Sequence, residues 1–390
     1  MPCGSWALPP VGNSLHLQSH PALKILLFTL LFSVEEAKKG EGFTNPNPMV
    51  GAVLVKDGRI VGRDYHHRYG EYHAERNAIG HCGEDLAGAE LYVTLEPCCH
   101  YGKTPPCTEI ILESGIRTVY IGSMDPNPLV AGKGAEILRR HGIEVITGIC
   151  EDECRKLNRV FFHYIRSKTP YVVMKYAMTA DGKIATKTGA SKWITGEAAR
   201  ERVHKSRHQY MGIMVGVGTV LADDPKLTCR LKGKRSPVRI VCDTNLRTPL
   251  ASALVRTAKE TPVILATAVR DEEMIRPYRE AGCRVLEVPL EQKHINLQIL
   301  MQKLGELGID SILLEGGAEL NYSALKSGIV QAVDMYVAPK LFGGFGAKTP
   351  VAGEGVNFPQ EAFVLCEPRI EQIGEDILIQ WEVKPCLRES

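Results

Sequence analysis

The sequence has almost no net charge. Its 390 residues contain 47 lysines and arginines against 45 aspartates and glutamates, which gives a formal charge of +2 at pH 7. Without an excess of positive charge, the protein has no broad electrostatic field for holding a polyanion. We therefore expect no nucleic acid among its partners, whereas a small phosphorylated metabolite is compatible with this composition.

Long apolar runs are lacking too. The most apolar stretch, LKILLFTLLFSV at 23–34, is shorter than the roughly 20 residues that cross a bilayer. A signal peptide is an alternative, but the stretch has one nearby basic residue, Lys24, and no small-residue cleavage site after Ser33. We expect no membrane partner, and we interpret the stretch as a helix of the first domain or as a mis-assigned start.

The sequence also lacks the regularly spaced cysteines of a secreted disulfide framework. Its 12 cysteines are scattered from Cys3 to Cys386, and the only dense group lies in LEPCCHYGKTPPC at 95–107. This distribution indicates a reducing, cytoplasmic location. It also directs attention to what the dense group binds.

The chain is long enough for about two domains. Residues 49–149 alternate Val/Ile-rich runs with helical segments, and the KDG turn at 56–58 indicates a β-hairpin. A polar helical stretch then leads to a second α/β series without internal repeats. We predict an atypical N-terminal segment at 1–34, a first domain at 35–150, a helical linker at 151–168 and a second domain at 169–385.

His73 and Glu75 begin a predicted helix in the motif HAE, and Cys98 and Cys107 flank the loop of the dense cysteine group. One histidine and two cysteines match a catalytic zinc site, which typically has three protein ligands and leaves a fourth position to water. Side chains in the first turn of a helix point toward its N-terminus, so Glu75 can overhang the same point without being a ligand. Because zinc lowers the pKa of its water, Glu75 can carry the proton to a leaving amine. These are the parts of a hydrolytic deaminase.

Two other interpretations of this group stay open. The thiols and the imidazole could be buried side chains without a metal, or the zinc could be structural and closed by His100 or Cys99. The eight residues between the two cysteines replace the two-residue gap of the deaminase signature H-x-E…P-C-x-x-C. In this longer loop Lys103 and His100 can reach a substrate phosphate, and the two prolines stiffen its return.

The second half lacks the G-x-G-x-x-G fingerprint of a Rossmann dinucleotide site. It has two junctions at which a strand leads through glycine into a helix, GIMVGVGTVLADDP at 212–225 and SILLEGGAELNYSAL at 311–325. Backbone N–H groups at such helix starts can hold phosphates, although many of these junctions are only tight turns. We therefore predict a nucleotide or phosphate ligand for this half.

Longer motifs run through both halves: TNPNPMVGAVLVKDGRIVG, YHAERNA, LEPCCHYGKTPPC and DPNPLVAGKG in the first, and MKYAMTADGKIAT, SKWITG, GVGTVLADDPKLTCR, DTNLRTP, LEGGAEL and APKLFGG in the second. Together they resemble the RibD family of bifunctional riboflavin-biosynthesis proteins. Residues 1–34 do not match the helix that usually opens the family. The resemblance implies a cytidine-deaminase-like three-layer α/β/α domain followed by a dihydrofolate-reductase-like α/β domain, with zinc and NADPH as cofactors.

By this resemblance the protein deaminates 2,5-diamino-6-(5-phosphoribosylamino)pyrimidin-4(3H)-one and then reduces the ribosyl group of 5-amino-6-(5-phosphoribosylamino)uracil with NADPH. His73, Cys98 and Cys107 would bind zinc and Glu75 would shuttle the proton, while Lys175 is a candidate proton donor for the reduction. The cofactor positions are Ala177, Trp193, Thr219, Asp223, Thr244, Gly317, Ala318, Glu319, Leu320, Asn321, Tyr322 and Ser323. The substrate positions are Asn47, Lys103, Ser191, Arg207, Leu227, Arg230 and Glu315. Phosphoribosylated pyrimidines are the implied partners, and the implied assembly is a homo-oligomer.

Several of these positions have other roles open to them. Arg207 and Arg230 can grip a phosphate bidentately or form surface salt bridges. Trp193 can stack near the nicotinamide or fill the core, and Asp223 and Asn47 can be turn residues. Two functions compete with the implied one: a nucleoside, nucleotide or tRNA deaminase with an unrelated second domain, and a non-catalytic binding protein.

Overall fold

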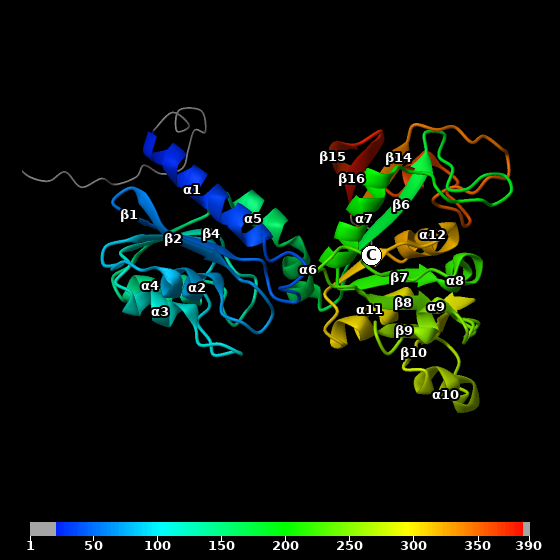
Figure 1. The fold of residues 1–390 in the computed structure, drawn as a ribbon, viewed down its shortest axis with the longest axis horizontal. Helices are drawn as coiled ribbons and strands as arrows, with labels where there is room; N and C mark the ends of the chain where they lie inside the picture. Colours follow the sequence, from blue (N-terminus) through cyan, green and yellow to red (C-terminus); the bar gives the residue numbers. More distant parts are fainter. Residues whose placement is uncertain (1–20, 385–390) are drawn as a thin grey trace, which may run out of the picture. The chain divides into compact units, whose positions relative to one another are not determined.

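The computed structural model describes residues 21–384 (Figure 1). The chain divides into two compact units, the first ending at Arg159 and the second beginning at Val160. Each unit is an α/β fold with its own sheet. Within the described residues, no helix combines the length and the apolar character needed to cross a membrane.

The first unit is a five-stranded sheet between two layers of helices. Its elements are α1 (Pro21–Lys38), β1 (Gly51–Lys56), β2 (Arg59–Tyr65), α2 (Ala74–His81), β3 (Glu90–Leu95), α3 (Cys107–Glu113), β4 (Thr118–Ser123), α4 (Lys133–Arg140), β5 (Glu144–Thr147) and α5 (Glu151–Leu157). The strand order is β2-β1-β3-β4-β5, with β1 antiparallel to both neighbours and β3, β4 and β5 parallel. Helices α1 and α5 cover one face, and α2, α3 and α4 cover the other (Figure 1).

The hairpin between β1 and β2 forms where the KDG turn predicts it. Asp57 and Gly58 have φ values of 51° and 75°. Two consecutive residues with positive φ make the primed turn that matches the twist of the flanking strands. Strands β1 and β3 are buried over most of their length, so the sequence of each is an apolar run.

The apolar run at 23–34 forms most of α1. The segment predicted as atypical therefore contains a helix that packs on the first sheet. Leu30 and Val34 are buried against the core, and the Ser33 hydroxyl donates to the carbonyl of Tyr92 in β3. The helix lies close to β1 at Gly51, where an added Cβ would stand 2.0 Å from the carbonyl oxygen of Ser33. A larger residue at that position would therefore push the helix away from the sheet.

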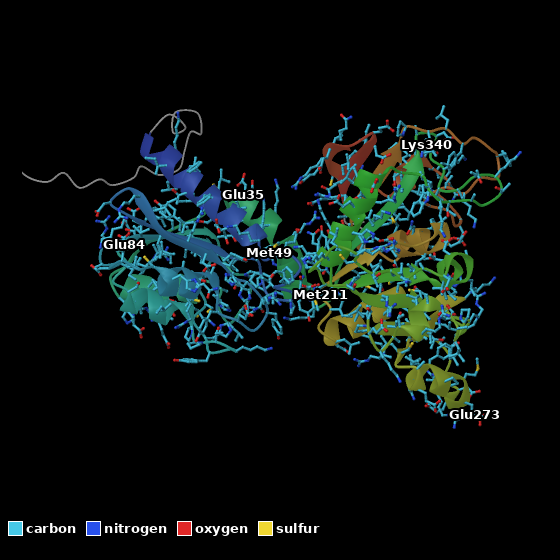
Figure 2. The ribbon with its side chains drawn as sticks, in the orientation of Figure 1. Glu35, Met49, Glu84, Met211, Glu273 and Lys340 are labelled. Atoms are coloured by element: carbon cyan, nitrogen blue, oxygen red, sulfur yellow. The ribbon has the colours of Figure 1, made fainter. Side chains whose placement is uncertain are left out.

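Two helices occupy the stretch predicted as a linker. Cys154 of α5 is fully buried in the core of the first unit. At the end of α5, the Asn158 side chain accepts a hydrogen bond from the N–H of Met49 (labelled in Figure 2) and donates one to its carbonyl, each at 2.8 Å. One amide thereby anchors the segment that carries Asn47.

The second unit is built on a nine-stranded sheet. Its elements are α6 (Arg159–Ser167), β6 (Tyr171–Thr179), α7 (Glu197–Gln209), β7 (Gly212–Gly216), α8 (Val217–Asp223), β8 (Val238–Cys242), α9 (Ala253–Arg256), β9 (Val263–Thr267), α10 (Glu272–Glu280), β10 (Arg284–Glu287), β11 (Leu290–Glu291), β12 (His294–Ile295), α11 (Leu297–Glu306), β13 (Ser311–Leu314), α12 (Ala318–Lys326), β14 (Val330–Ala338), the 3₁₀ helix η2 (Pro359–Glu361), β15 (Leu365–Ile373) and β16 (Asp376–Val383). The strand order is β10-β9-β8-β7-β13-β6-β14-β16-β15. Within this sheet all pairings are parallel except those of β16 with β14 and β15, and β11 and β12 form a separate antiparallel pair.

Several elements of this unit were not predicted from the sequence, and the longest of them are α10 and β15. Helix α10 is rich in charge and contains Pro277, which usually ends a helix. Strand β15 lies at the edge of the sheet, is mostly exposed, and contains a register shift between Cys366 and Arg369. An exposed edge strand does not need apolar side chains, so it lacks the alternation by which strands are recognised.

Candidate functional site

The first unit brings together the three residues expected to bind zinc. Nδ1 of His73 lies 3.4 Å from Sγ of Cys98 and 3.5 Å from Sγ of Cys107, and the three atoms all lie within 4.8 Å of one another. His73 is the N-cap of α2, and Cys107 is the first residue of α3. The backbone N–H of Cys107 points at Sγ of Cys98 at 3.3 Å. We call this group the ligand cluster.

The ligand cluster fits a tetrahedral zinc ion. With Zn–S of about 2.3 Å and Zn–N of about 2.0–2.1 Å, tetrahedral angles place nitrogen and sulfur about 3.5 Å apart. The two distances between His73 and the thiols have this length. Among the described residues the cluster has three members and not four, which leaves a position for water as in a catalytic site.

Glu75 lies beside the ligand cluster, in the first turn of α2. It is 3% exposed, and one of its carboxylate oxygens, Oε2, finds no hydrogen-bond donor among residues 21–384. Burial raises the pKa of Glu75 to about 7. A carboxylate that titrates near neutral pH can both accept a proton and give it up.

The two cysteines of the cluster share a proton. The hydrogen bond from Cys107 lowers the pKa of the Cys98 thiol, with a further contribution from His73. The same bond, together with burial, raises the pKa of Cys107. One member of the pair is therefore a thiolate at neutral pH, and the thiolate is the form that binds metals.

Asn47 is held by a neighbour that the sequence analysis did not single out. Its side-chain nitrogen Nδ2 lies 3.2 Å from Nε2 of His66, and Nδ1 of His66 lies 2.9 Å from the carbonyl of Tyr72. That carbonyl can only accept, so the proton of His66 is on Nδ1 and Nε2 accepts from Asn47. Burial lowers the pKa of His66 to about 4, which keeps the ring neutral. Asn47 is thereby fixed with its amide nitrogen toward His66.

The loop between the two cysteines has no regular secondary structure, and its side chains have different surroundings. Cys99 lies with its thiol 3.7 Å from the carbonyl of Leu129, away from the ligand cluster, so it does not act as a fourth ligand. Nδ1 of His100 is buried and has no partner among the described residues. Lys103 is exposed, and its ammonium lies 3.9 Å from the centre of the Tyr69 ring.

Glu96 is a second residue that the sequence analysis did not single out. It is buried two positions before Cys98, and it accepts hydrogen bonds from the N–H groups of Asp125, Gly132 and Ala135. These bonds join the strand that leads to Cys98 to the loop and first turn of α4. A lone Glu before Pro97 carries no periodic signal, and its partners lie far along the chain, so spacing could not reveal it.

In the second unit, Arg207 and Glu315 meet in a largely buried ion pair. Nε and Nη2 of Arg207 each donate to a carboxylate oxygen of Glu315 at 2.8 Å, and Nη1 donates to the carbonyl of Thr228. Burial would raise the pKa of Glu315, but the charges of Arg207 and Lys175 outweigh it and lower the pKa to about 2. We expected the guanidinium of Arg207 to bind a phosphate bidentately. In the structure it binds the carboxylate of Glu315 in this way instead. The pair is also largely shielded from solvent, unlike the surface salt bridge of the alternative.

The other predicted substrate residues of this unit differ in exposure. Arg230 and Ser191 are exposed, whereas Leu227 is buried, with a φ of 53°. Lys175 of β6 lies near the Arg207–Glu315 pair, and burial lowers the pKa of its ammonium. Lys175 also stands 5.5 Å from the centre of the Tyr336 ring.

The two glycine junctions of the second unit adjoin each other. They follow β7 and β13, which are neighbouring parallel strands, and an added Cβ at Gly317 would lie 4.0 Å from the Thr219 hydroxyl. No side chain caps α8 at Gly216 or α12 at Gly317. Uncapped N–H groups at two adjacent helix starts suit the phosphates of a dinucleotide, so these residues fit NADPH.

Within the predicted stretch from Gly317 to Ser323, the side chains have different environments. Asn321 is fully buried, and its amide nitrogen donates to the carbonyl of Pro350, which holds the turn. Tyr322 lines an apolar pocket of about 330 Å³ and donates to the carbonyl of Gly355. Ala318, Glu319, Leu320 and Ser323 complete the first turns of α12.

The remaining cofactor positions are spread over the second unit. Trp193 is 65% exposed with the Arg200 guanidinium 4.6 Å from its ring centre, so it does not fill the core. Asp223 ends α8 and is exposed. Ala177 lies in β6, and Thr244 follows β8 with its carbonyl accepting from Ala268.

Comparisons with known proteins match both units. The model of the RibD C-terminal domain matches residues 170–379, and that of the cytidine and deoxycytidylate deaminase zinc-binding region matches residues 28–123. The riboflavin biosynthesis protein RibD of Actinobacillus pleuropneumoniae is 58% identical over 347 residues, covering 89% of this chain and 92% of that protein. The RibD of Aquifex aeolicus is 44% identical over 344 residues, covering 88% and 94%. This chain belongs to the RibD family.

Solved structures of the family have the same fold. A diaminohydroxyphosphoribosylaminopyrimidine deaminase/5-amino-6-(5-phosphoribosylamino)uracil reductase from Thermotoga maritima gives a TM-score of 0.81 at 40% identity, covering 94% of this chain and 100% of that one. RibD from Acinetobacter baumannii gives 0.83 at 35% identity, covering 93% and 99%. The predicted pair of α/β domains, deaminase-like and then reductase, is confirmed.

Membership of the RibD family decides between the functions left open by the sequence. The chain is a bifunctional enzyme of riboflavin biosynthesis that combines a deaminase and a reductase, with zinc and NADPH as cofactors. It acts on small-molecule substrates. A deaminase with an unrelated second domain and a non-catalytic binding protein are both excluded.

Proposed function

We propose that the first unit deaminates the phosphoribosylated diaminopyrimidine named for the Thermotoga enzyme, and that the second unit reduces the resulting phosphoribosylaminouracil. The observation that carries the first half is the ligand cluster with the unpartnered carboxylate oxygen of Glu75 beside it. No purely structural metal site needs a buried, unpaired acid next to it, because such a group costs free energy unless it is used.

In this proposal His73, Cys98 and Cys107 hold the zinc. When bound, zinc supplies a water of lowered pKa as the attacking group. Glu75 takes up the proton of that water and delivers it to the leaving amine, and its pKa of about 7 suits both steps. Asn47, oriented by His66, would contact the pyrimidine with its amide oxygen.

For the reductase we propose that Ser191, Arg207, Leu227, Arg230 and Glu315 surround the ribotide. Arg230 would contact the phosphate, with Arg207 held in place by Glu315. The junctions at Thr219 and Gly317 would take the phosphates of NADPH, with Ala177, Trp193, Asp223 and Thr244 along the rest of the cofactor. Lys175, whose pKa is lowered by burial, is the proposed proton donor.

The test of the deaminase half is the substitution Glu75→Gln in the zinc-loaded full chain. Ammonia release from the diaminopyrimidine ribotide should fall by at least about a hundredfold, because a positioned proton carrier contributes about 10²–10⁴ in rate. Zinc content should stay at one per chain, and NADPH oxidation with the aminouracil ribotide should be unchanged. Substitution of Glu84, which pairs with Arg59 on the surface (labelled in Figure 2), by Gln is the matched control and should alter neither activity. Undiminished ammonia release from Glu75→Gln would refute the proposal.

We further propose that the enzyme works in the cytoplasm as a homo-oligomer, with neither nucleic acid nor membrane as a partner. Every cysteine within residues 21–384 is a free thiol, which suits a reducing compartment. The near-zero net charge supports the exclusion of nucleic acid.

A further inference from the structure

Two loops of the first unit contact each other beside the ligand cluster. One joins β2 to α2 and ends at His73, and the other joins Cys98 to Cys107. Across these loops the Lys103 ammonium lies 3.9 Å from the centre of the Tyr69 ring. The stem of Lys103 runs along the same turn, since a Cβ added at Gly70 would lie 3.6 Å from its Cδ. This exposed lysine therefore has a defined resting place.

The charge of Lys103 is oriented but not neutralised. None of the ion pairs found among residues 21–384 includes it. An aromatic face attracts an ammonium through its quadrupole but offers no acceptor oxygen. The N–H groups of Lys103 are thus free to donate to an anion, whereas a carboxylate partner would compete with that anion.

Tyr69 is itself fixed to a third segment. Its backbone N–H donates to the carbonyl of Phe43 at 3.2 Å, and the guanidinium of the preceding Arg68 lies 5.1 Å from the centre of the Phe43 ring. Phe43 begins the stretch that leads to Asn47. The ring under Lys103 is therefore tied to the same segment as the proposed pyrimidine contact.

From this arrangement we infer that Tyr69 is a positioning residue that holds Lys103 ready for the 5-phosphate of the ribotide. The inference rests on the proposed deaminase function and on the substrate position that the family resemblance implies for Lys103. A ribosyl phosphate is several bonds away from the pyrimidine that loses ammonia, so its site belongs at some distance from the ligand cluster and not beside Glu75. A free lysine loses much rotamer freedom when it grips a phosphate, and a ring that already restricts it reduces that loss.

The experiment measures ammonia release by the zinc-loaded full chain with two substrates, the pyrimidine ribotide and the same pyrimidine with an unphosphorylated ribose. Lys103→Met should lower kcat/KM for the phosphorylated substrate by about ten- to hundredfold, as expected for a lost charged hydrogen bond. Tyr69→Leu should lower it about two- to fivefold, mainly through KM, which is the range of an exposed cation–π contact. Neither change should affect the unphosphorylated substrate.

Two further variants separate positioning from a merely structural role. Tyr69→Phe keeps the aromatic face and should retain the wild-type preference for the phosphorylated substrate. In the Lys103→Met background, Tyr69→Leu should have no further effect, because the ring then has no cation to hold. A loss with Tyr69→Leu that is equal for both substrates, or that persists without Lys103, would overturn the inference.

The outcomes also distinguish the inference from the function on which it rests. If the Lys103→Met enzyme still prefers the phosphorylated substrate, Lys103 does not contact the phosphate, and Tyr69 has no positioning role. The deaminase assignment would survive that result, since it depends on Glu75 and the ligand cluster. If Lys103→Met loses the preference and Tyr69→Leu keeps it, only the positioning role fails.

Discussion

Arg207 and Glu315 form a charged pair whose side chains are about one-seventh exposed. Both carboxylate oxygens of Glu315 accept from the guanidinium, and the backbone N–H of Glu315 donates to Met214. The pair is therefore set in place at the start of the glycine junction. Such a pair keeps its geometry only while both partners are charged.

Acid should weaken the second unit through this pair. The pKa of about 2 for Glu315 lies below its ordinary value of 4.5, so the stabilisation is complete above pH 4.5 and is lost as the pH falls toward 2. The urea midpoint of the second unit should drop across this window. At pH 7, Glu315→Gln should cost about 3–5 kcal/mol, because it strands the guanidinium. The double variant Arg207→Met/Glu315→Leu is the control: it should recover stability at pH 7 and show a smaller drop in acid. Equal acid dependence in both proteins would contradict the prediction.

At the scale of residues, the sequence was sufficient for the ligand cluster and Glu75, and not for the residues that hold them. The HAE motif and the cysteine spacing are local patterns, and the structure brings these side chains together. His66 and Glu96 act through partners on other segments, and such pairings do not appear in one sequence. The same limit applies to Arg207. Its guanidinium binds Glu315, which lies 108 positions away, and one sequence does not show that pairing.

At the scale of elements, helix α4 lies so close to the segment before Cys98 that its second residue must be glycine. A Cβ at Gly134 would stand 2.1 Å from the carbonyl oxygen of Pro97. Glu96 reinforces this approach by accepting from Ala135. The position of one proposed zinc ligand, Cys98, thus depends on a helix that contributes no residue to the ligand cluster.

Gly134→Ala should therefore weaken both folding and metal binding. Overpacking of this kind costs about 1–3 kcal/mol, and the displaced Pro97 would move Cys98 out of tetrahedral register. Unfolding of the first unit and competition with a zinc chelator measure the two effects. Gly80→Ala is the matched control, since a Cβ there meets nothing within 4 Å and alanine is favoured over glycine in a helix by up to about 1 kcal/mol. Unchanged zinc affinity in Gly134→Ala would contradict the coupling.

Most elements with a buried apolar face or run were predicted from the sequence, and the exceptions have physical reasons. Helix α1 has apolar residues on both of its sides: Leu30 and Val34 are buried, whereas Ile25 and Phe28 are exposed. Its sequence is therefore apolar without helical periodicity, and the apolar run alone could not separate a domain helix from a signal peptide. Strand β15 is mostly exposed and has few apolar residues, so the sequence did not predict it.

At the scale of the whole molecule, the ligand cluster lies entirely in the first unit and the NADPH candidates entirely in the second. The metal should thus stabilise one unit only, since a ligand that binds the folded state raises stability by about 4 kcal/mol at a thousand times its Kd. Calorimetry with and without a zinc chelator should show one transition lowered and the other unmoved. NADPH oxidation with the aminouracil ribotide should survive chelation.

The control for this prediction is Cys107→Ser, which removes a ligand. Its first-unit transition should already be low and should no longer respond to the chelator. A shift of both transitions in the wild-type enzyme would mean that the two units do not unfold independently, and the prediction would then fail.

The order of strands in the large sheet governs how the second unit can form during translation. Strand β6 is made first, yet its partners in the sheet are β13 and β14, which leave the ribosome more than a hundred residues later. At about 5–20 residues per second, the apolar segment of β6 waits on the order of ten seconds for both neighbours. Throughout that interval the nascent chain exposes an unpaired, aggregation-prone strand. The deaminase sheet, in contrast, has all its strands before residue 150, so it can be complete while β6 of the reductase still lacks its neighbours.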